Sequence, residues 1–184
     1  MRNIVYALGV GVCIATLLLA ANSFKTLPGT FDPDHTGIIS SAWVAGIGLP
    51  DAGNSNHGLY LAKDGPTSTN AAAFAQIDGV AGIKLTELGY DVKDGGHCSG
   101  GAPRFNVTAS DGFHFVGACT NGTPTGIPAA GWTRYRFSDA QAFPPIDPSA
   151  TVSSISILFD EEGSVVIDNI DVNGTLMGKP GNAK

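Results

Sequence analysis

The feature that most constrains the fold is a strict alternation of apolar and polar residues near the C-terminus. In the run VSSISILF, the side chains of Ile155, Ile157 and Phe159 alternate with serine or leucine. A period of two places successive side chains on opposite faces of a strand, so this run fits a strand with one buried face. The next residues, DEEG, are typical of a turn, and residues 165–172 form a second apolar run. We therefore predict a β-hairpin here.

The rest of the chain has the same character and shows no long helical periodicity after residue 23. Short apolar runs are separated by turn-forming clusters, and the chain has 25 glycines, 11 prolines and only 14% charged residues. This pattern is typical of an all-β domain. We predict an all-β fold, a single antiparallel β-sandwich of the jelly-roll type over residues 37–174. We expect an extended lead-in at residues 24–36 and a flexible tail at residues 175–184.

The N-terminus has the tripartite form of a secretory signal peptide in residues 1–23. A positively charged start, MRN, precedes an uncharged apolar run, and small residues follow at an A-x-S cleavage site. The apolar run is also near the lower length limit for a membrane-spanning helix, so an uncleaved anchor is the alternative. Cleavage would leave 184 − 23 = 161 residues, which suits one domain. We expect a secreted protein, extracellular or periplasmic, with no membrane contact once the signal peptide is removed.

The charge of the mature chain limits its partners. Loss of Arg2 changes the balance from 10 basic and 16 acidic residues to 9 and 16, a net charge of −7. Nucleic-acid binding requires a basic face, so we expect no nucleic-acid partner.

Two cysteines, Cys98 and Cys119, would remain in the mature chain. An even number of cysteines in an oxidising compartment indicates a disulfide, which is the reading we favour. A zinc site formed with His97 and His114 is the alternative, but no C-x2-C or H-x3-H spacing supports it. The disulfide would make residues 90–119 a covalently closed pair of core strands with a glycine-rich loop at one end.

Two details of this block can be tested against a structure. We predict that Phe113 and Phe115 point into the core and that His114 points outward, because the residues alternate. The glycine-rich loop before Arg104 carries His97. Glycine permits backbone conformations that aim amide groups at a ligand, so His97 is a candidate ligand-binding residue. A tight corner anchored by the disulfide is the alternative that we favour.

The segment SISILFDEEGSVVIDNIDVNG resembles the last two strands of galactose-binding-like jelly rolls, which include many carbohydrate-binding modules of bacterial secreted proteins. The middle block, GVAGIKLTELGYDVKDGGHCSGGAPRFNVTASDG followed by GAC, resembles uncharacterised bacterial secreted proteins that share this closing segment. The resemblance covers residues 58–174. It implies a carbohydrate-binding-module-like jelly roll and no particular ligand, because this fold hosts unrelated activities.

The same resemblance implies a structural calcium ion held by an acidic residue of the last strand, which matches Asp168. First and last strands commonly meet in a sandwich, so Asp32 and Asp34 could approach Asp168. Calcium prefers 6–8 oxygen ligands, mainly carboxylates and backbone carbonyls. The alternative is that alternation simply turns Asp168 to one face of the strand and Asn169 to the other.

Aromatic residues are candidates for sugar binding, because their rings stack on the apolar faces of pyranoses. Trp132 follows the long loop 121–131 and precedes Arg134, and loops on a rigid sandwich often carry binding sites. We therefore take Trp132 and Arg134 as candidate ligand-binding residues, and Trp43 as a further one. Core packing is the alternative for the aromatic residues, because aromatics dominate buried area.

Common enzyme signatures are absent from the sequence: it has no G-x-S-x-G elbow, no H-E-x-x-H motif and no P-loop. Our leading hypothesis is a secreted, non-catalytic binding module for carbohydrate or a cell-surface polymer, with structural calcium as the one cofactor implied. One alternative is a structural or adhesive surface protein with protein partners. Another is a small extracellular hydrolase that uses the His97 loop.

Overall fold

A computed structural model describes residues 24–180 and 182–183, so the predicted signal peptide lies outside the described residues. The described part consists of strands joined by loops, with two single-turn 3₁₀ helices. Its elements are β1 (Lys25–Phe31), β2 (Ile39–Val44), β3 (Gly58–Lys63), β4 (Ala72–Asp78), β5 (Glu87–Lys93), β6 (Arg104–Ala109), β7 (Gly112–Gly117), η1 (Cys119–Asn121), β8 (Pro124–Gly126), β9 (Trp132–Ser138), η2 (Asp139–Gln141), β10 (Val152–Phe159), β11 (Gly163–Val172), β12 (Thr175–Lys179) and β13 (Asn182–Ala183).

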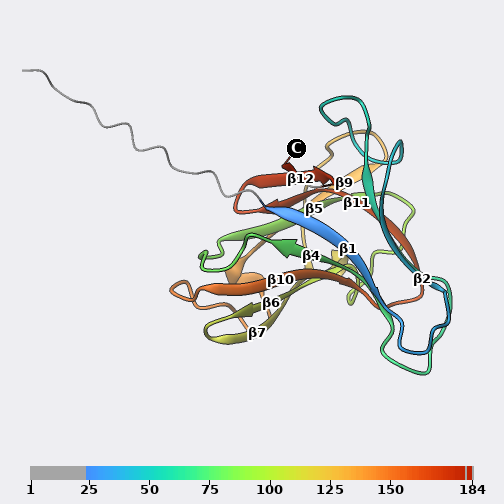
Figure 1. The fold of residues 1–184 in the computed structure, drawn as a ribbon. Helices are drawn as coiled ribbons and strands as arrows, with labels where there is room; N and C mark the ends of the chain where they lie inside the picture. Colours follow the sequence, from blue (N-terminus) through green and yellow to red (C-terminus); the bar gives the residue numbers. More distant parts are fainter. Residues whose placement is uncertain (1–23, 181, 184) are drawn as a thin grey trace, which may run out of the picture.

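Two antiparallel sheets form a sandwich (Figure 1). The five-stranded sheet has the strand order β1-β4-β10-β6-β7. The eight-stranded sheet runs β13-β12-β11-β5-β9-β8, and β3 also pairs with β11 and carries β2 on its other edge. The core packs between the sheets and includes Phe105 and Ile155 from the first and Leu88 and Ile167 from the second, all fully buried. The predicted all-β sandwich of the jelly-roll type is confirmed.

The predicted C-terminal hairpin, in contrast, is wrong. Strand β10 lies between β4 and β6 in the five-stranded sheet, whereas β11 lies in the eight-stranded sheet. The DEEG segment between them therefore crosses from one sheet to the other. Two strands of one hairpin and two strands of opposite sheets show the same alternation of apolar and polar residues, because each strand turns one apolar face to the core. Ile155 and Ile157 bury that face in one sheet, and Ile167 does so in the other.

Both ends of the sandwich extend further than the sequence predicts. Residues 25–31, expected as part of the lead-in, form the edge strand β1, which pairs with β4 along its whole length. Residues 175–179, expected in the flexible tail, form β12 on β11. The buried hydroxyl of Thr26 donates to the sulfur of Met177 at 3.2 Å and so joins the two ends. Pro28 and the polar tail hide these strands in the sequence, but proline is tolerated on an edge strand.

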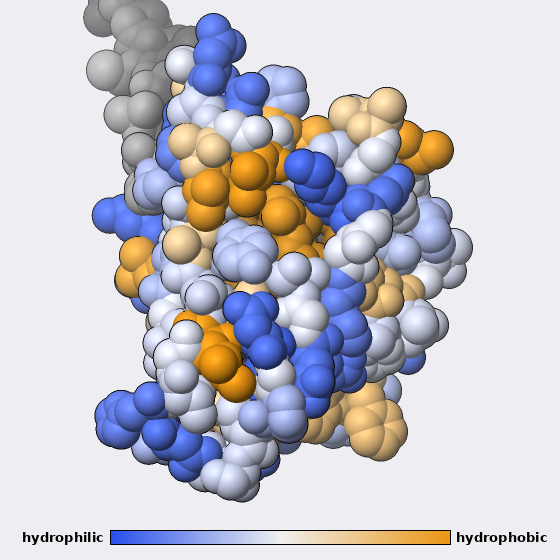
Figure 2. All heavy atoms as spheres, turned by 90° about the vertical axis from the view of Figure 1, so that its right-hand side faces the viewer, coloured by the Kyte–Doolittle hydropathy of each residue, from blue (hydrophilic) through white to orange (hydrophobic). Residues whose placement is uncertain are grey.

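Two polar loops lie together at the right-hand end of the view in Figure 1. Asp34, in the β1–β2 loop, accepts hydrogen bonds from the hydroxyls of Ser68 (2.7 Å) and Thr69 (3.0 Å) in the β3–β4 loop. Figure 2 shows the molecule from that end, where the lower part of the surface is mostly hydrophilic and hydrophobic residues gather higher up. These hydrogen bonds tie the loops to each other.

Within the part of the chain that the structure describes, we find no helix with the length and hydrophobicity needed to span a bilayer.

Candidate functional site

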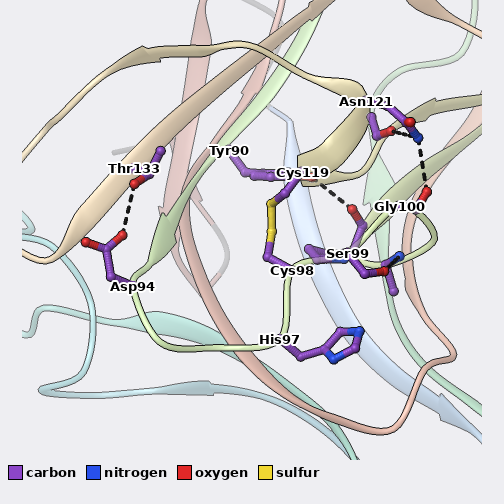
Figure 3. The surroundings of a disulfide bond; sticks show 12 residues. Tyr90, Asp94, His97, Cys98, Ser99, Gly100, Cys119, Asn121 and Thr133 are labelled. Carbon is purple, nitrogen blue, oxygen red and sulfur yellow. Dashed lines mark hydrogen bonds between the residues drawn. A yellow bond between two sulfur atoms is a disulfide. The ribbon is translucent and has the colours of Figure 1, made fainter.

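A disulfide between Cys98 and Cys119 anchors the glycine-rich loop (Figure 3). The two Cα atoms are 5.4 Å apart. Cys98 follows β5 of the eight-stranded sheet, and Cys119 follows β7 of the five-stranded sheet. The predicted disulfide is therefore confirmed, and so is the predicted closed pair of core strands, because the segment that the bond closes contains the antiparallel pair of β6 and β7. The buried Tyr90 hydroxyl adds a second tie by donating to the carbonyl of Pro103 at 2.8 Å.

The carboxylate of Glu161 clamps the same loop to the connection between β10 and β11. His97 Nε2 lies 2.5 Å from Glu161 Oε2, and the Ser99 hydroxyl donates to the same oxygen. Partial burial raises the pKa of Glu161. The hydrogen bonds from Ser99 and His97, together with the charge of His97, lower it by more, so the pKa lies below its usual value. Gly101 has no room for a side chain here, because a Cβ would collide with Glu161 Oε1.

A second acidic residue of this connection, Asp160, pairs with Arg104 at the start of β6. Arg104 Nη1 and Nη2 each donate to one carboxylate oxygen of Asp160 at 2.8 Å, and Nη1 also donates to the carbonyl of Gly101 at 2.7 Å. Partial burial raises the pKa of Asp160, but the hydrogen bonds and charge of Arg104 lower it below its usual value. The guanidinium carbon lies 5.5 Å from the centroid of the Phe115 ring, within cation–π range.

A groove of about 540 Å³ lies beside Arg104, at the β7 edge of the five-stranded sheet. This volume is within the range of small-molecule sites. Two exposed aromatic residues line the groove, namely Phe115 (43% exposed) and Phe143 (77% exposed). The Asn121 amide donates to the carbonyls of Gly100 (3.0 Å) and Gly117 (3.2 Å), which fixes the amide's orientation. The complete lining is Gly100, Gly101, Arg104, Phe115, Gly117, Asn121, Gln141 and Phe143.

The exposure of Phe115 reverses the face that the sequence predicts for β7. Phe113 and Phe115 point outward, with their rings 5.0 Å apart, whereas His114 is only 1% exposed. His114 can be buried because its Nδ1 lies 2.8 Å from the carbonyl of Pro144 and its Nε2 lies 3.0 Å from Asp111. The prediction that His114 faces solvent is wrong. A two-residue period identifies two faces, but it does not say which one is buried when both polar nitrogens find partners.

The candidates Trp132 and Arg134 lie together on β9, in the eight-stranded sheet and away from the groove lining. Trp132 is only 6% exposed. Arg134 donates from Nε and Nη2 to the two carboxylate oxygens of the fully buried Asp91, at 2.8 and 2.9 Å. The hydrogen bond to Asp91 raises the pKa of Arg134 more than burial lowers it. Their ligand-binding role stays a prediction.

The other two candidates also have structural partners. The Trp43 indole donates to the backbone carbonyl of Thr26 at 3.1 Å, and its ring packs against the core while half-buried. His97, besides its contact with Glu161, lies edge-on to the Phe159 ring with centroids 5.5 Å apart. The structure does not bring Trp43, His97 and Trp132 into one groove, and the binding roles of Trp43 and His97 stay predictions.

A bulge in β11 gathers acidic residues on the outer face of the eight-stranded sheet. The register against β5 shifts between Asp168 and Asp171, and Asn169 has a positive φ of 46°. Asparagine tolerates this left-handed conformation better than most residues. The bulge overrides simple alternation, so Asp168 and Asn169 are both buried, and the Asn169 amide donates to Asp91 at 2.6 Å. Arg136 Nε pairs with Asp171 at 3.0 Å.

The two predicted calcium ligands have separate protein partners. Asp168 accepts hydrogen bonds from the backbone amides of Leu49 and Asn169, both at 2.6 Å. Asp32 accepts from Gly37 (2.8 Å) and Thr36 (3.0 Å) within its own exposed loop. Among the described residues, no group of three or more His, Cys, Asp or Glu side chains is placed to hold a metal ion. The structural calcium site at Asp168 and Asp32 stays a prediction.

Sequence reasoning missed the aromatic residues of the groove, Phe115 and Phe143, and the acidic residues that position its wall, Asp160 and Glu161. The run of three acids in the DEEG segment is a signal that could have pointed to a basic partner such as Arg104, because carboxylates and arginine form strong paired hydrogen bonds. No signal in the sequence points to Phe143, which approaches β7 through backbone hydrogen bonds with Phe115 at 2.8 and 2.9 Å.

The comparisons with known proteins relate this chain to a solved structure but to no family model. No protein-family model matches the chain, and no curated protein matches it. The fold is similar to the family 11 carbohydrate-binding module of the cellulosomal cellulase Lic26A-Cel5E of Clostridium thermocellum. The two chains are 15% identical, with a TM-score of 0.46 over 92% of this chain and 98% of that one.

Proposed function

We propose that this protein is a secreted, non-catalytic binding module whose groove at the β7 edge takes a carbohydrate. The observation that carries this proposal is the pair of exposed rings, Phe115 and Phe143, beside a groove lined by glycine backbone and by the amides of Asn121 and Gln141. Neighbouring exposed apolar residues that are rimmed by polar groups often mark a ligand-binding groove.

The chemistry of the groove suits a sugar. The apolar C–H face of a pyranose stacks on an aromatic ring, and this contact removes the apolar surface of both groups from water. Sugar hydroxyls both donate and accept hydrogen bonds. The Asn121 amide nitrogen is used by two backbone carbonyls, so its oxygen is the group that accepts from a sugar. Gln141 Oε1 accepts from the Ser138 amide at 2.9 Å, so its nitrogen is the group that donates. Gly100 is exposed and lines the groove, so its backbone faces a ligand there.

The clamp at Glu161 favours a binding role over hydrolysis. In a serine hydrolase the imidazole accepts the proton of the serine hydroxyl, and a carboxylate orients the imidazole from its other side. Here Ser99 and His97 contact the same oxygen of Glu161. The carboxylate therefore holds both side chains and the loop in place.

The disulfide supports the proposed location. Disulfides persist in oxidising compartments and are rare in reducing ones. Cys98 and Cys119 are bonded in the structure, which fits an exported protein.

A glycan array followed by calorimetry tests the proposal. We expect binding to at least one neutral glycan, and we expect Phe115→Ala to weaken it roughly tenfold, which corresponds to about 1.4 kcal/mol. Ile127→Ala is the matched control, because Ile127 is 79% exposed but does not line the groove. Trp132→Ala tests the surface that the sequence predicts. Binding that is lost in Trp132→Ala and kept in Phe115→Ala would move the site to β9, and no binding to any glycan would refute the proposal in favour of a protein partner.

A further inference from the structure

The groove shares Arg104 and Phe115 with the outer face of the five-stranded sheet. In β6 and β10 the residues Val107 and Ile155 point into the core. Their neighbours Asn106 and Ser156 therefore point outward, because side chains alternate along a strand. A ligand that leaves the groove at Phe115 meets this face next.

One row of paired residues crosses all five strands from the groove to the far edge. The sheet register places Phe115 opposite Asn106, Asn106 opposite Ser156, Ser156 opposite Gln76, and Gln76 opposite Leu27. Each of these side chains is half-buried or exposed, and Leu27 is 44% exposed. The row thus has apolar groups at its two ends and an amide, a hydroxyl and a second amide between them.

The hydrogen-bonding groups of this row are uncharged. Asn106 Oδ1 accepts from Arg104 Nε at 3.3 Å, which turns the amide nitrogen of Asn106 away from the guanidinium. The charge of Arg104 itself is balanced by Asp160. At the far corner of the face, Lys25 lies directly opposite Asp78, so these charges also face each other. A face with neutral donors and acceptors and with balanced charges complements a neutral ligand and offers an anionic polymer no excess positive charge.

The length of the row sets the size of the ligand. Neighbouring strands in a sheet lie about 4.8 Å apart, so four spacings from β7 to β1 span about 19 Å. This is several times the width of one sugar ring. A monosaccharide would fill the groove at Phe115 and leave Ser156 and Gln76 without contact.

We propose that the ligand is a linear, uncharged polysaccharide that lies in the groove at Phe115 and continues across the strands along Asn106, Ser156 and Gln76. This rests on the proposed function, and it adds the charge, the minimum length and the path of the ligand. The residues at the far end act only on ligands that are long enough to reach them.

Calorimetry with neutral linear oligosaccharides of two and six units, and with a uronic-acid hexamer, tests this path. We expect the neutral hexamer to bind about tenfold or more tightly than the dimer, because each hydrogen bond gained is worth about a fivefold change in affinity. Gln76→Ala should weaken hexamer binding about fivefold and leave dimer binding unchanged. Phe115→Ala should weaken both. Ile127→Ala, which lies off the path, should weaken neither.

The outcomes separate this inference from the proposed function. Equal affinity for the dimer and the hexamer, or an unchanged hexamer affinity in Gln76→Ala, would overturn the path while the groove remained a sugar site. Tighter binding of the uronic-acid hexamer would overturn the neutral ligand. No binding of any sugar would remove the proposed function itself. Because Gln76 is half-buried at the surface, its replacement leaves the core intact, and circular dichroism verifies the fold.

Discussion

Removal of the disulfide is the perturbation whose size the structure defines best. The bond joins Cys98 and Cys119, which are separated by 21 positions and lie in the β5–β6 and β7–β8 connections, each of which links the two sheets. In the chain-entropy model, closing a loop of this length stabilises the folded state by about 3 kcal/mol. Cys98→Ala/Cys119→Ala should therefore lower Tm by about 6–12 °C, because each kcal/mol shifts a domain of this size by about 2–4 °C.

Thermal unfolding followed by circular dichroism measures this shift, and the reduced wild-type protein should unfold at a similarly lowered temperature. The fold itself should persist, because backbone pairing in both sheets does not depend on the bond. Sugar affinity should fall as well, because Gly100 and Gly101 line the groove and lie just after Cys98. A Tm that changes by less than about 2 °C on both mutation and reduction would refute the reasoning that this bond restricts the unfolded chain.

Three further changes probe the ionisable groups and the orientation of β7. Glu161→Gln should reduce the pH dependence of stability in acid: the folded pKa of Glu161 is lowered, so its contribution is present above the ordinary value of 4.5 and is lost as the pH falls through the lower folded value. Urea unfolding at several pH values tests this, and a constant difference from the wild type would contradict it. Asp91→Ala removes the buried carboxylate that pairs with Arg134 and should lower the free energy of unfolding, measured in urea, by about 3 kcal/mol. A decrease of less than about 1 kcal/mol would show that the ion pair is dispensable. His114→Ala should cost about 1–3 kcal/mol, because it removes a buried ring and its hydrogen bonds to Pro144 and Asp111, while Phe113→Ala should cost much less; the opposite order would restore the predicted orientation of β7.

The sequence predicts the fold class and the disulfide well, because both depend on local or countable features. Alternation around Ile155 and Ile157 shows that these side chains share one buried face. It carries no information on the neighbouring strand, and for this reason the predicted pairing of β10 with β11 is wrong. Strand pairing is decided by contacts between distant segments, such as β10 with β4 and β6.

The errors at single residues have a common physical cause, which is that polar groups can be buried when partners reach them. His114 is buried because Pro144 and Asp111 contact its two nitrogens. Asn169 is buried because a bulge and the carboxylate of Asp91 accommodate it. In both cases the partner is supplied by the three-dimensional arrangement, so residue type alone predicts the wrong face.

The groove combines three separate segments of the chain, and the same arrangement explains why an acidic protein can present a neutral site. The chain has 16 acidic and 10 basic residues, yet the two acids nearest the groove are already engaged. Asp160 binds Arg104 with both oxygens, and Glu161 holds His97 and Ser99. Each carboxylate has its lowered pKa because its partners stabilise the charged form. Those contacts shape the wall of the groove and balance its charge, so what faces a ligand is ring, amide and backbone, the groups that a neutral sugar requires.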